Sequence, residues 1–134
     1  MNAFRLVLVL SALVLTLGSA AAAGPLEVRT SNAGGVRVAV KPVSIAPGTK
    51  TWDFEVTMDT HSGSLDQDLS RDSLLVEDSG REHMPSAWKG DANGGHHRKG
   101  VLQFAPVPGN PKSIELRIKG VGTPEARVFA WKLR

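Results

Sequence analysis

The sequence predicts an all-β protein, an antiparallel two-sheet sandwich of immunoglobulin-like or cupredoxin-like topology with about seven to eight strands. Two observations support this prediction: short runs in which apolar and polar residues alternate, and turn-forming residues about every ten positions between them. The 134 residues are 41% hydrophobic and 22% charged, the composition of one ordinary globular domain.

Residues 1–23 have the features of a secretory signal peptide. Arg5 precedes an apolar run from Leu6 to Leu17, and small residues follow as far as Ala23. The apolar run is too short to span a bilayer. We therefore expect cleavage near Ala23, export to the periplasm or the medium, and a single, monomeric domain over residues 24–134 with no membrane anchor. The chain has no cysteine, so this domain is expected to fold without disulfides.

Strand patterns recur along the rest of the chain. Alternation with period two is clearest where Val36, Trp52 and Ile114 each begin a run of inward-facing apolar residues. In the last segment, Phe129, Trp131 and Leu133 form the predicted inner set. The candidate strands are residues 26–30, 36–41, 52–59, 74–77, 83–88, 101–105, 114–119 and 127–133.

The segment SLDQDLSRDSLL, residues 64–75, departs from the strand pattern. Leu65 and Leu69 have helical spacing, which predicts a short helical turn that crosses from one sheet to the other. The alternating acids from Asp66 onward resemble the ligand spacing of a calcium loop, but the required glycine and the final glutamate are missing. We therefore interpret Asp66 as the cap of the helical turn.

Histidines are concentrated in two polar loops. His61 follows one predicted strand, and His96 and His97 lie in the glycine-rich loop before another. Histidine is the commonest transition-metal ligand, so convergence of these loops predicts a copper(II) or zinc site, with Asp59 or Asp66 as an oxygen ligand. Only one of the adjacent pair is expected to point at it, because neighbouring residues in an extended chain face opposite ways. His83 is expected at the opposite end of the sandwich.

The same segments carry a resemblance to known proteins. With DTHSGSLDQDL, WKG and GGHHRKGVLQF, roughly residues 52–105 resemble a group of small exported bacterial β-sandwich domains. The resemblance implies the fold and directs attention to the histidines, but it implies no particular activity. A looser similarity to periplasmic copper-carrier sandwiches implies copper binding, although the methionine-rich segment of those proteins is missing here.

Other function classes have little support in the sequence. There is no G-x-S-x-G, H-E-x-x-H or C-x-x-C motif and no phosphate-binding glycine loop, so we expect a non-catalytic protein. Basic and acidic residues are interspersed and the formal net charge is only +3, so no nucleic-acid partner is expected. Two functions remain: binding of copper or zinc through the loop histidines, or an interaction module that holds a protein of the cell envelope through the same loops or a sheet edge.

Overall fold

The computed structural model describes residues 26–134, so the predicted signal peptide lies outside the described residues. The described part contains nine β-strands and one short helix: β1 (Arg29–Ala33), β2 (Val36–Ser44), β3 (Trp52–Thr60), α1 (Leu69–Asp72), β4 (Ser73–Glu77), β5 (Glu82–His83), β6 (Ala87–Gly90), β7 (His97–Phe104), β8 (Ser113–Ile118) and β9 (Arg127–Lys132). Among residues 26–134 no helix is long and apolar enough to cross a membrane.

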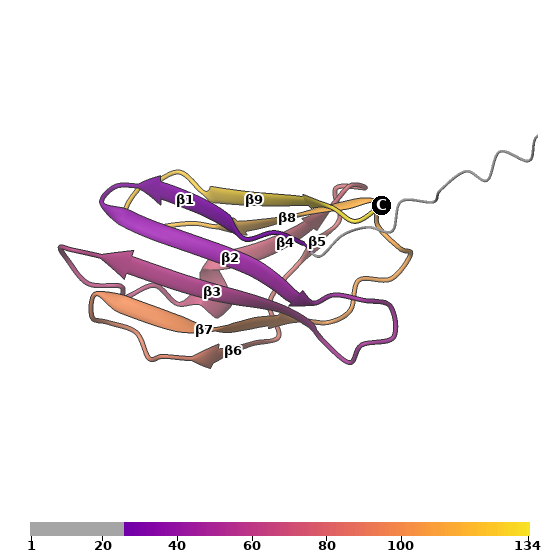
Figure 1. Cartoon of the computed structure of the whole chain (residues 1–134), viewed down its shortest axis with the longest axis horizontal. Helices are drawn as coiled ribbons and strands as arrows, with labels where there is room; N and C mark the ends of the chain where they lie inside the picture. Colours follow the sequence, from indigo (N-terminus) through magenta and orange to yellow (C-terminus); the bar gives the residue numbers. More distant parts are fainter. Residues whose placement is uncertain (1–25) are drawn as a thin grey trace, which may run out of the picture.

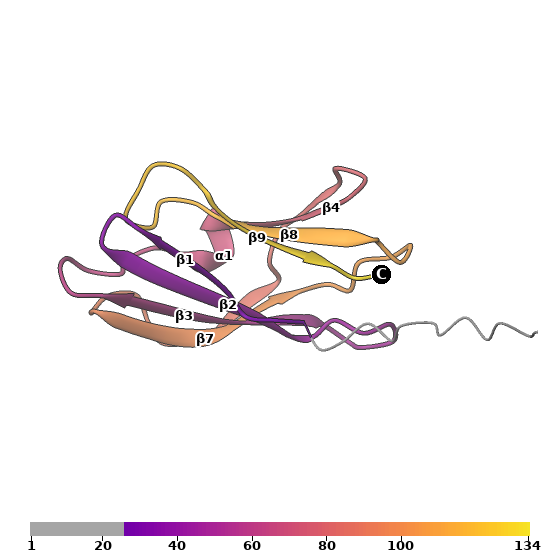
Figure 2. The same ribbon diagram turned by 45° about the horizontal axis from the view of Figure 1, so that its top comes forward.

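The strands form two antiparallel sheets, which confirms the predicted two-sheet sandwich. The five-stranded sheet has the order β1-β2-β3-β7-β6, and the four-stranded sheet has the order β5-β4-β8-β9. In Figure 1 the strands run along the long axis of the molecule, and Figure 2 separates the layer of β4, β8 and β9 from that of β1, β2, β3 and β7.

The core lies between the inner faces of the two sheets. The alternation predicted from the sequence holds through β2, β3 and β8, where every second residue is buried. Phe54 is near the centre of the core: its ring meets Phe104 edge-to-face with centroids 5.6 Å apart, and its centroid lies 5.8 Å from that of Trp131. Full burial of a side chain of this size stabilises the fold by roughly 1.5–3 kcal/mol.

Two glycines form the turn of the first hairpin. Ala33 pairs with Val36, so only Gly34 and Gly35 connect β1 to β2. Their φ angles are 55° and 74°, the left-handed conformation that the tight two-residue hairpin turn requires at both positions. β1 therefore covers residues 29–33, up to the glycines, and not the predicted residues 26–30.

One predicted strand is wrong. The segment 83–88 is not continuous: β5 pairs with β4 in the small sheet, whereas β6 pairs with β7 in the large sheet. Pro85 lies between them, has no N–H to donate to a ladder and favours a break. The chain changes sheets here, which raises the strand number from the eight segments predicted to nine.

A helical turn, α1, connects β3 of the large sheet to β4 of the small sheet, as predicted, but it covers only Leu69–Asp72, so Leu65 lies before the helix and not on it. Leu65 and Leu69 are both buried. The predicted cap is wrong: Asp68, not Asp66, is the N-cap, and its carboxylate accepts a hydrogen bond from the Ser70 amide at 3.1 Å. The hydrogen bond from the Ser70 hydroxyl is the main cause that holds the pKa of Asp68 below its ordinary value.

A buried arginine joins the two sheets. Arg127, at the start of β9, is 3% exposed. Its guanidinium donates to the carbonyl oxygens of Ser31, Ala33, Val36 and Val121 at 3.0, 2.7, 3.1 and 2.6 Å. Burial lowers its pKa from the ordinary value. The charge is thus stabilised by backbone dipoles, and the β1–β2 hairpin is fixed against the last strand.

Candidate functional site

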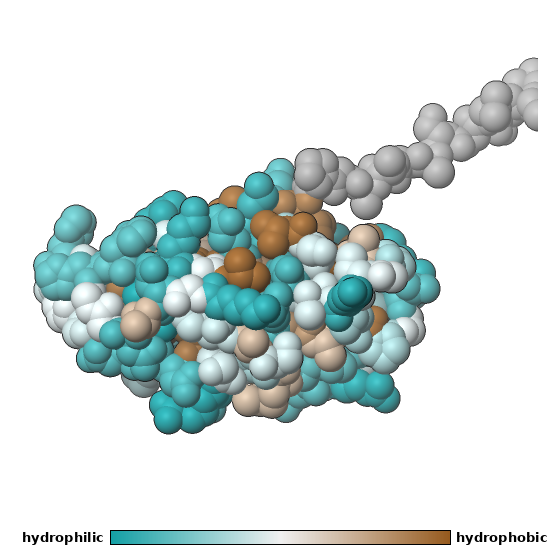
Figure 3. All heavy atoms as spheres, turned by 90° about the horizontal axis from the view of Figure 1, so that it is seen from below, coloured by the Kyte–Doolittle hydropathy of each residue, from teal (hydrophilic) through white to brown (hydrophobic). Residues whose placement is uncertain are grey.

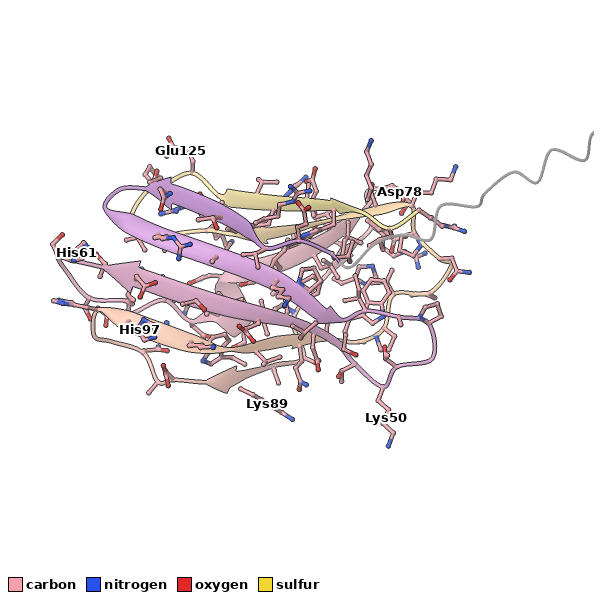
Figure 4. All side chains as sticks on the ribbon, in the orientation of Figure 1. Lys50, His61, Asp78, Lys89, His97 and Glu125 are labelled. Atoms are coloured by element: carbon pink, nitrogen blue, oxygen red, sulfur yellow. The ribbon has the colours of Figure 1, made fainter. Side chains whose placement is uncertain are left out.

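Two polar loops lie together at one end of the sandwich. We call the loops of residues 61–68 and 91–96, with the ends of β3 and β7 that they adjoin, the histidine end. Figure 4 shows His61 and His97 at this end, while Lys50 and Asp78 lie at the other. The loops meet because β3 and β7 are neighbours in the large sheet.

His97 and Asp59 form the clearest side-chain pair at this end. They are directly opposite each other in the β3–β7 ladder, where side chains of opposed residues lie on the same face. His97 Nδ1 forms a hydrogen bond with Asp59 Oδ1, and the two side chains are 60% and 44% exposed. Two of the five predicted metal ligands are therefore in contact, on the solvent-facing side of the large sheet.

The other three predicted ligands are not gathered with this pair. His61 and His96 are exposed loop residues, and the carbonyl oxygen of His96 accepts from the Thr60 amide at 2.9 Å. Asp66 instead accepts a hydrogen bond from the Ser64 hydroxyl at 2.7 Å. Within residues 26–134 there is no group of three or more His, Cys, Asp or Glu side chains that could hold a metal ion. The predicted five-residue set is thus not assembled in this structure.

The two loops are joined through a buried arginine that the sequence reading missed. Arg98, the residue after the histidine pair, is 1% exposed. Its guanidinium donates to the carbonyl oxygens of Leu65 and Gln67 at 3.1 and 2.7 Å, and to Asn93 Oδ1 at 3.1 Å. It therefore holds residues from both loops at once.

Backbone hydrogen bonds reinforce this junction. The Leu65 amide donates to the Gly95 carbonyl at 2.9 Å, and the Gly94 amide donates back to the Leu65 carbonyl at 2.8 Å. These bonds pair the loops much as two strands are paired. The exposed side chains of the histidine end are consequently carried on a fixed backbone.

The electrostatics of Arg98 follow from its burial. Removal from water lowers the pKa of the guanidinium, and the carboxylates of Asp91, Asp66 and Asp68 act in the opposite direction. The arginine has no direct carboxylate partner within hydrogen-bonding distance among the described residues, and its acceptors are backbone and amide oxygens. Its role is structural: it joins loop backbones and does not face solvent.

Trp88 forms the base of the histidine end, through contacts with Arg98 and with the loop of residues 91–96. The Arg98 guanidinium carbon lies 5.5 Å from the indole centroid, within cation–π range. The indole N–H donates to the Asp91 carbonyl at 2.9 Å. Below it, Gly90 and Gly100 are paired across β6 and β7, and a Cβ on Gly100 would lie only 2.7 Å from the indole Cζ2. Both glycines are needed for the indole to lie over this edge.

His83 lies at the opposite end, as the sequence predicts. Its Nε2 lies 2.7 Å from Glu77 Oε2, and the side chains are 21% and 11% exposed. The hydrogen bond from His83 is the main cause that lowers the pKa of Glu77, and one from the Ser79 hydroxyl adds to it. Asp78, which follows Glu77, is labelled at this end in Figure 4.

Comparison of the chain with protein-family models, with curated proteins and with solved structures finds no match in any of the three.

Proposed function

We propose that the protein is an exported, non-catalytic interaction module that holds a protein of the cell envelope through the histidine end. The observation that carries this proposal is the buried Arg98, which fixes the loops of residues 61–68 and 91–96 against each other. A buried arginine carries a desolvation penalty that only several good hydrogen bonds offset. A loop backbone fixed in this way presents its polar side chains with little loss of entropy on binding.

The composition of this surface suits a protein partner. The two loops expose imidazoles, a hydroxyl, a carboxylate and an amide, at His61, Ser62, Asp91, Asn93 and His96. These groups supply both donors and acceptors, the pattern found at the polar rim of a protein interface.

Site-specific crosslinking tests this proposal. A photoreactive amino acid at Ser62, which is exposed in the first loop, should give one discrete adduct with an envelope protein in the producing cell. The control position is Lys50, which is exposed at the other end of the sandwich (Figure 4). The same photoreactive amino acid there should give no such adduct. Excess unlabelled wild-type protein should suppress the adduct, whereas the His61→Ala variant should suppress it only partly. An adduct that forms equally from Lys50, or that unlabelled protein does not suppress, refutes the proposal.

The His97–Asp59 contact favours a second function, binding of copper(II) or zinc. These two side chains would supply two ligands, and His61, His96 or Asp66 would have to move to supply a third. Paramagnetic copper(II) bound here should quench Trp88, which lies beneath the loop, and the quenching should saturate near one equivalent. The metal function requires His97→Ala to abolish that saturation, whereas His83→Ala, at the other end, should leave it unchanged. A linear, non-saturating response excludes it.

A further inference from the structure

An apolar pocket opens at the end of the sandwich away from the histidine end. It lies between the β2–β3 loop, the β7–β8 loop, the start of the described chain at Leu26 and the residues after β9. Its volume is about 940 Å³, within the range of small-molecule sites. Figure 3 shows hydrophobic residues reaching the surface next to the start of the described chain.

The pocket continues the hydrophobic core to the surface. Trp52 and Val107, which are 4% and 6% exposed and belong to the core cluster, contribute to its lining. Val43, which also lines it, leaves 49% of its surface exposed. Ile45 and Leu133 are partly buried. Apolar surface left in water in this way favours an apolar ligand.

Five prolines stiffen the walls: Pro42, Pro47, Pro106, Pro108 and Pro111. Proline has a fixed φ and no backbone N–H. The prolines remove five backbone donors from the lining, and the amide of Leu133, which also lines the pocket, donates to the Lys112 carbonyl at 2.8 Å. The walls are therefore stiffened and poor in backbone donors at the five prolines, which suits a hydrocarbon chain.

The charged side chains of the lining are both basic. Lys41 and Arg134 line the pocket, and none of the described residues that line it is acidic. A side-chain N–H of Arg134 donates to the Asn110 carbonyl at the same pocket. An anionic group on the ligand is favoured at such a lining, and a cationic group is disfavoured.

We propose that this pocket binds an anionic amphiphile, a free long-chain carboxylate whose hydrocarbon chain packs against the prolines, Val43 and Trp52 and whose carboxylate lies by Lys41 or Arg134. The pocket lies away from the histidine end, so binding here is independent of the function proposed above.

Dodecanoate titrated into the tag-free protein below its micellar concentration tests the assignment. Binding should saturate at one equivalent by calorimetry, with a matching change in tryptophan emission because Trp52 lines the pocket. Val43→Asp places a charge among the apolar contacts and should weaken binding about tenfold or more. Val128→Asp is the matched control, since Val128 is 53% exposed on β9 and does not line the pocket, and it should bind as the wild type does.

Further ligands and variants test whether the basic side chains favour an anionic group on the ligand. Dodecanol should bind more weakly than dodecanoate, and dodecyltrimethylammonium more weakly still. Combined Lys41→Gln and Arg134→Gln should lower dodecanoate affinity about threefold or more without changing that of dodecanol, whereas Lys89→Gln should change neither. Lack of saturable dodecanoate binding, equal loss in Val128→Asp, or a cationic amphiphile that binds as tightly each overturns the proposal. Adsorption to phosphatidylglycerol vesicles without dodecanoate binding also overturns it, in favour of membrane docking.

Discussion

Replacement of Arg98 by methionine should destabilise the protein by about 3 kcal/mol, because hydrogen bonds to a charged donor contribute roughly 1.5–3 kcal/mol each. The side chain makes three such bonds, to Leu65 O, Gln67 O and Asn93 Oδ1, and a cation–π contact with Trp88. The expected loss is smaller than the sum of these three hydrogen-bond free energies, for three reasons. Methionine retains the aliphatic packing, the desolvation penalty of the cation disappears, and acceptors near the surface regain water.

Urea unfolding, followed by tryptophan emission and by circular dichroism, measures this change. In a domain of this size a loss of about 3 kcal/mol lowers the Tm by roughly 10–20 °C. Arg98→Lys should recover only part of the loss, because one ammonium cannot reproduce the planar fork of donors. Arg37→Met, at an exposed position on β2, is the matched control and should change stability by less than about 0.5 kcal/mol.

Hydrogen exchange separates the local effect from the global one. In Arg98→Met the amides of Leu65 and Gly94, which pair the two loops, should exchange faster than expected from the loss of global stability alone. Stability within about 0.5 kcal/mol of the wild type, with unchanged exchange at these amides, would refute the reasoning that Arg98 fixes the histidine end.

Three further predictions follow from the contacts. Gly100→Ala should destabilise by about 2 kcal/mol in urea unfolding, since its Cβ would lie 2.6 Å from the Gly90 Cα. His83 lowers the pKa of Glu77 in the folded state. The stability that the Glu77 carboxylate contributes is therefore fully present above its unfolded-state pKa and is lost as the pH falls through the lower folded-state pKa. Glu77→Gln should thus reduce the fall in the urea midpoint between about pH 6 and pH 3. Asp68→Ala should lower the Tm through loss of about 1 kcal/mol of capping energy.

Each of these three predictions has a control substitution at a neighbouring position. Lys99→Ala, at an exposed position beside Gly100, should leave the midpoint nearly unchanged, and an equal loss would point to the strand and not to the glycine contact. Glu82→Gln should keep the wild-type acid dependence, and loss of that dependence there would contradict the role given to Glu77. Asp66→Ala should be milder than Asp68→Ala, and the reverse order would restore Asp66 as the cap.

Much of the fold was predictable because burial imposes a period of two on each strand. The inner sets beginning at Val36, Trp52 and Ile114 are buried as predicted. The sequence reading failed at residues 83–88, where alternation alone cannot tell one strand from two that belong to different sheets. Pro85 was the signal that should have divided that segment.

The buried arginines were missed for a related reason. Arg98 is in phase with the inward-facing Leu102 and Phe104, and Arg127 is in phase with Phe129. Charged residues are normally found on the solvent face of a strand, so the alternation alone does not predict that these two arginines are buried. Their carbonyl acceptors come from segments distant in sequence, which local patterns do not reveal.

The contacts of Arg127 also bear on the order of events during synthesis. Arg127 and Ser31 are 96 positions apart, and β9 supplies Phe129 and Trp131 to the core. A growing chain cannot close the sandwich until β9 has left the ribosome, because the first hairpin lacks this donor until then. The partly made protein should thus remain open and accessible to chaperones until β9 has emerged.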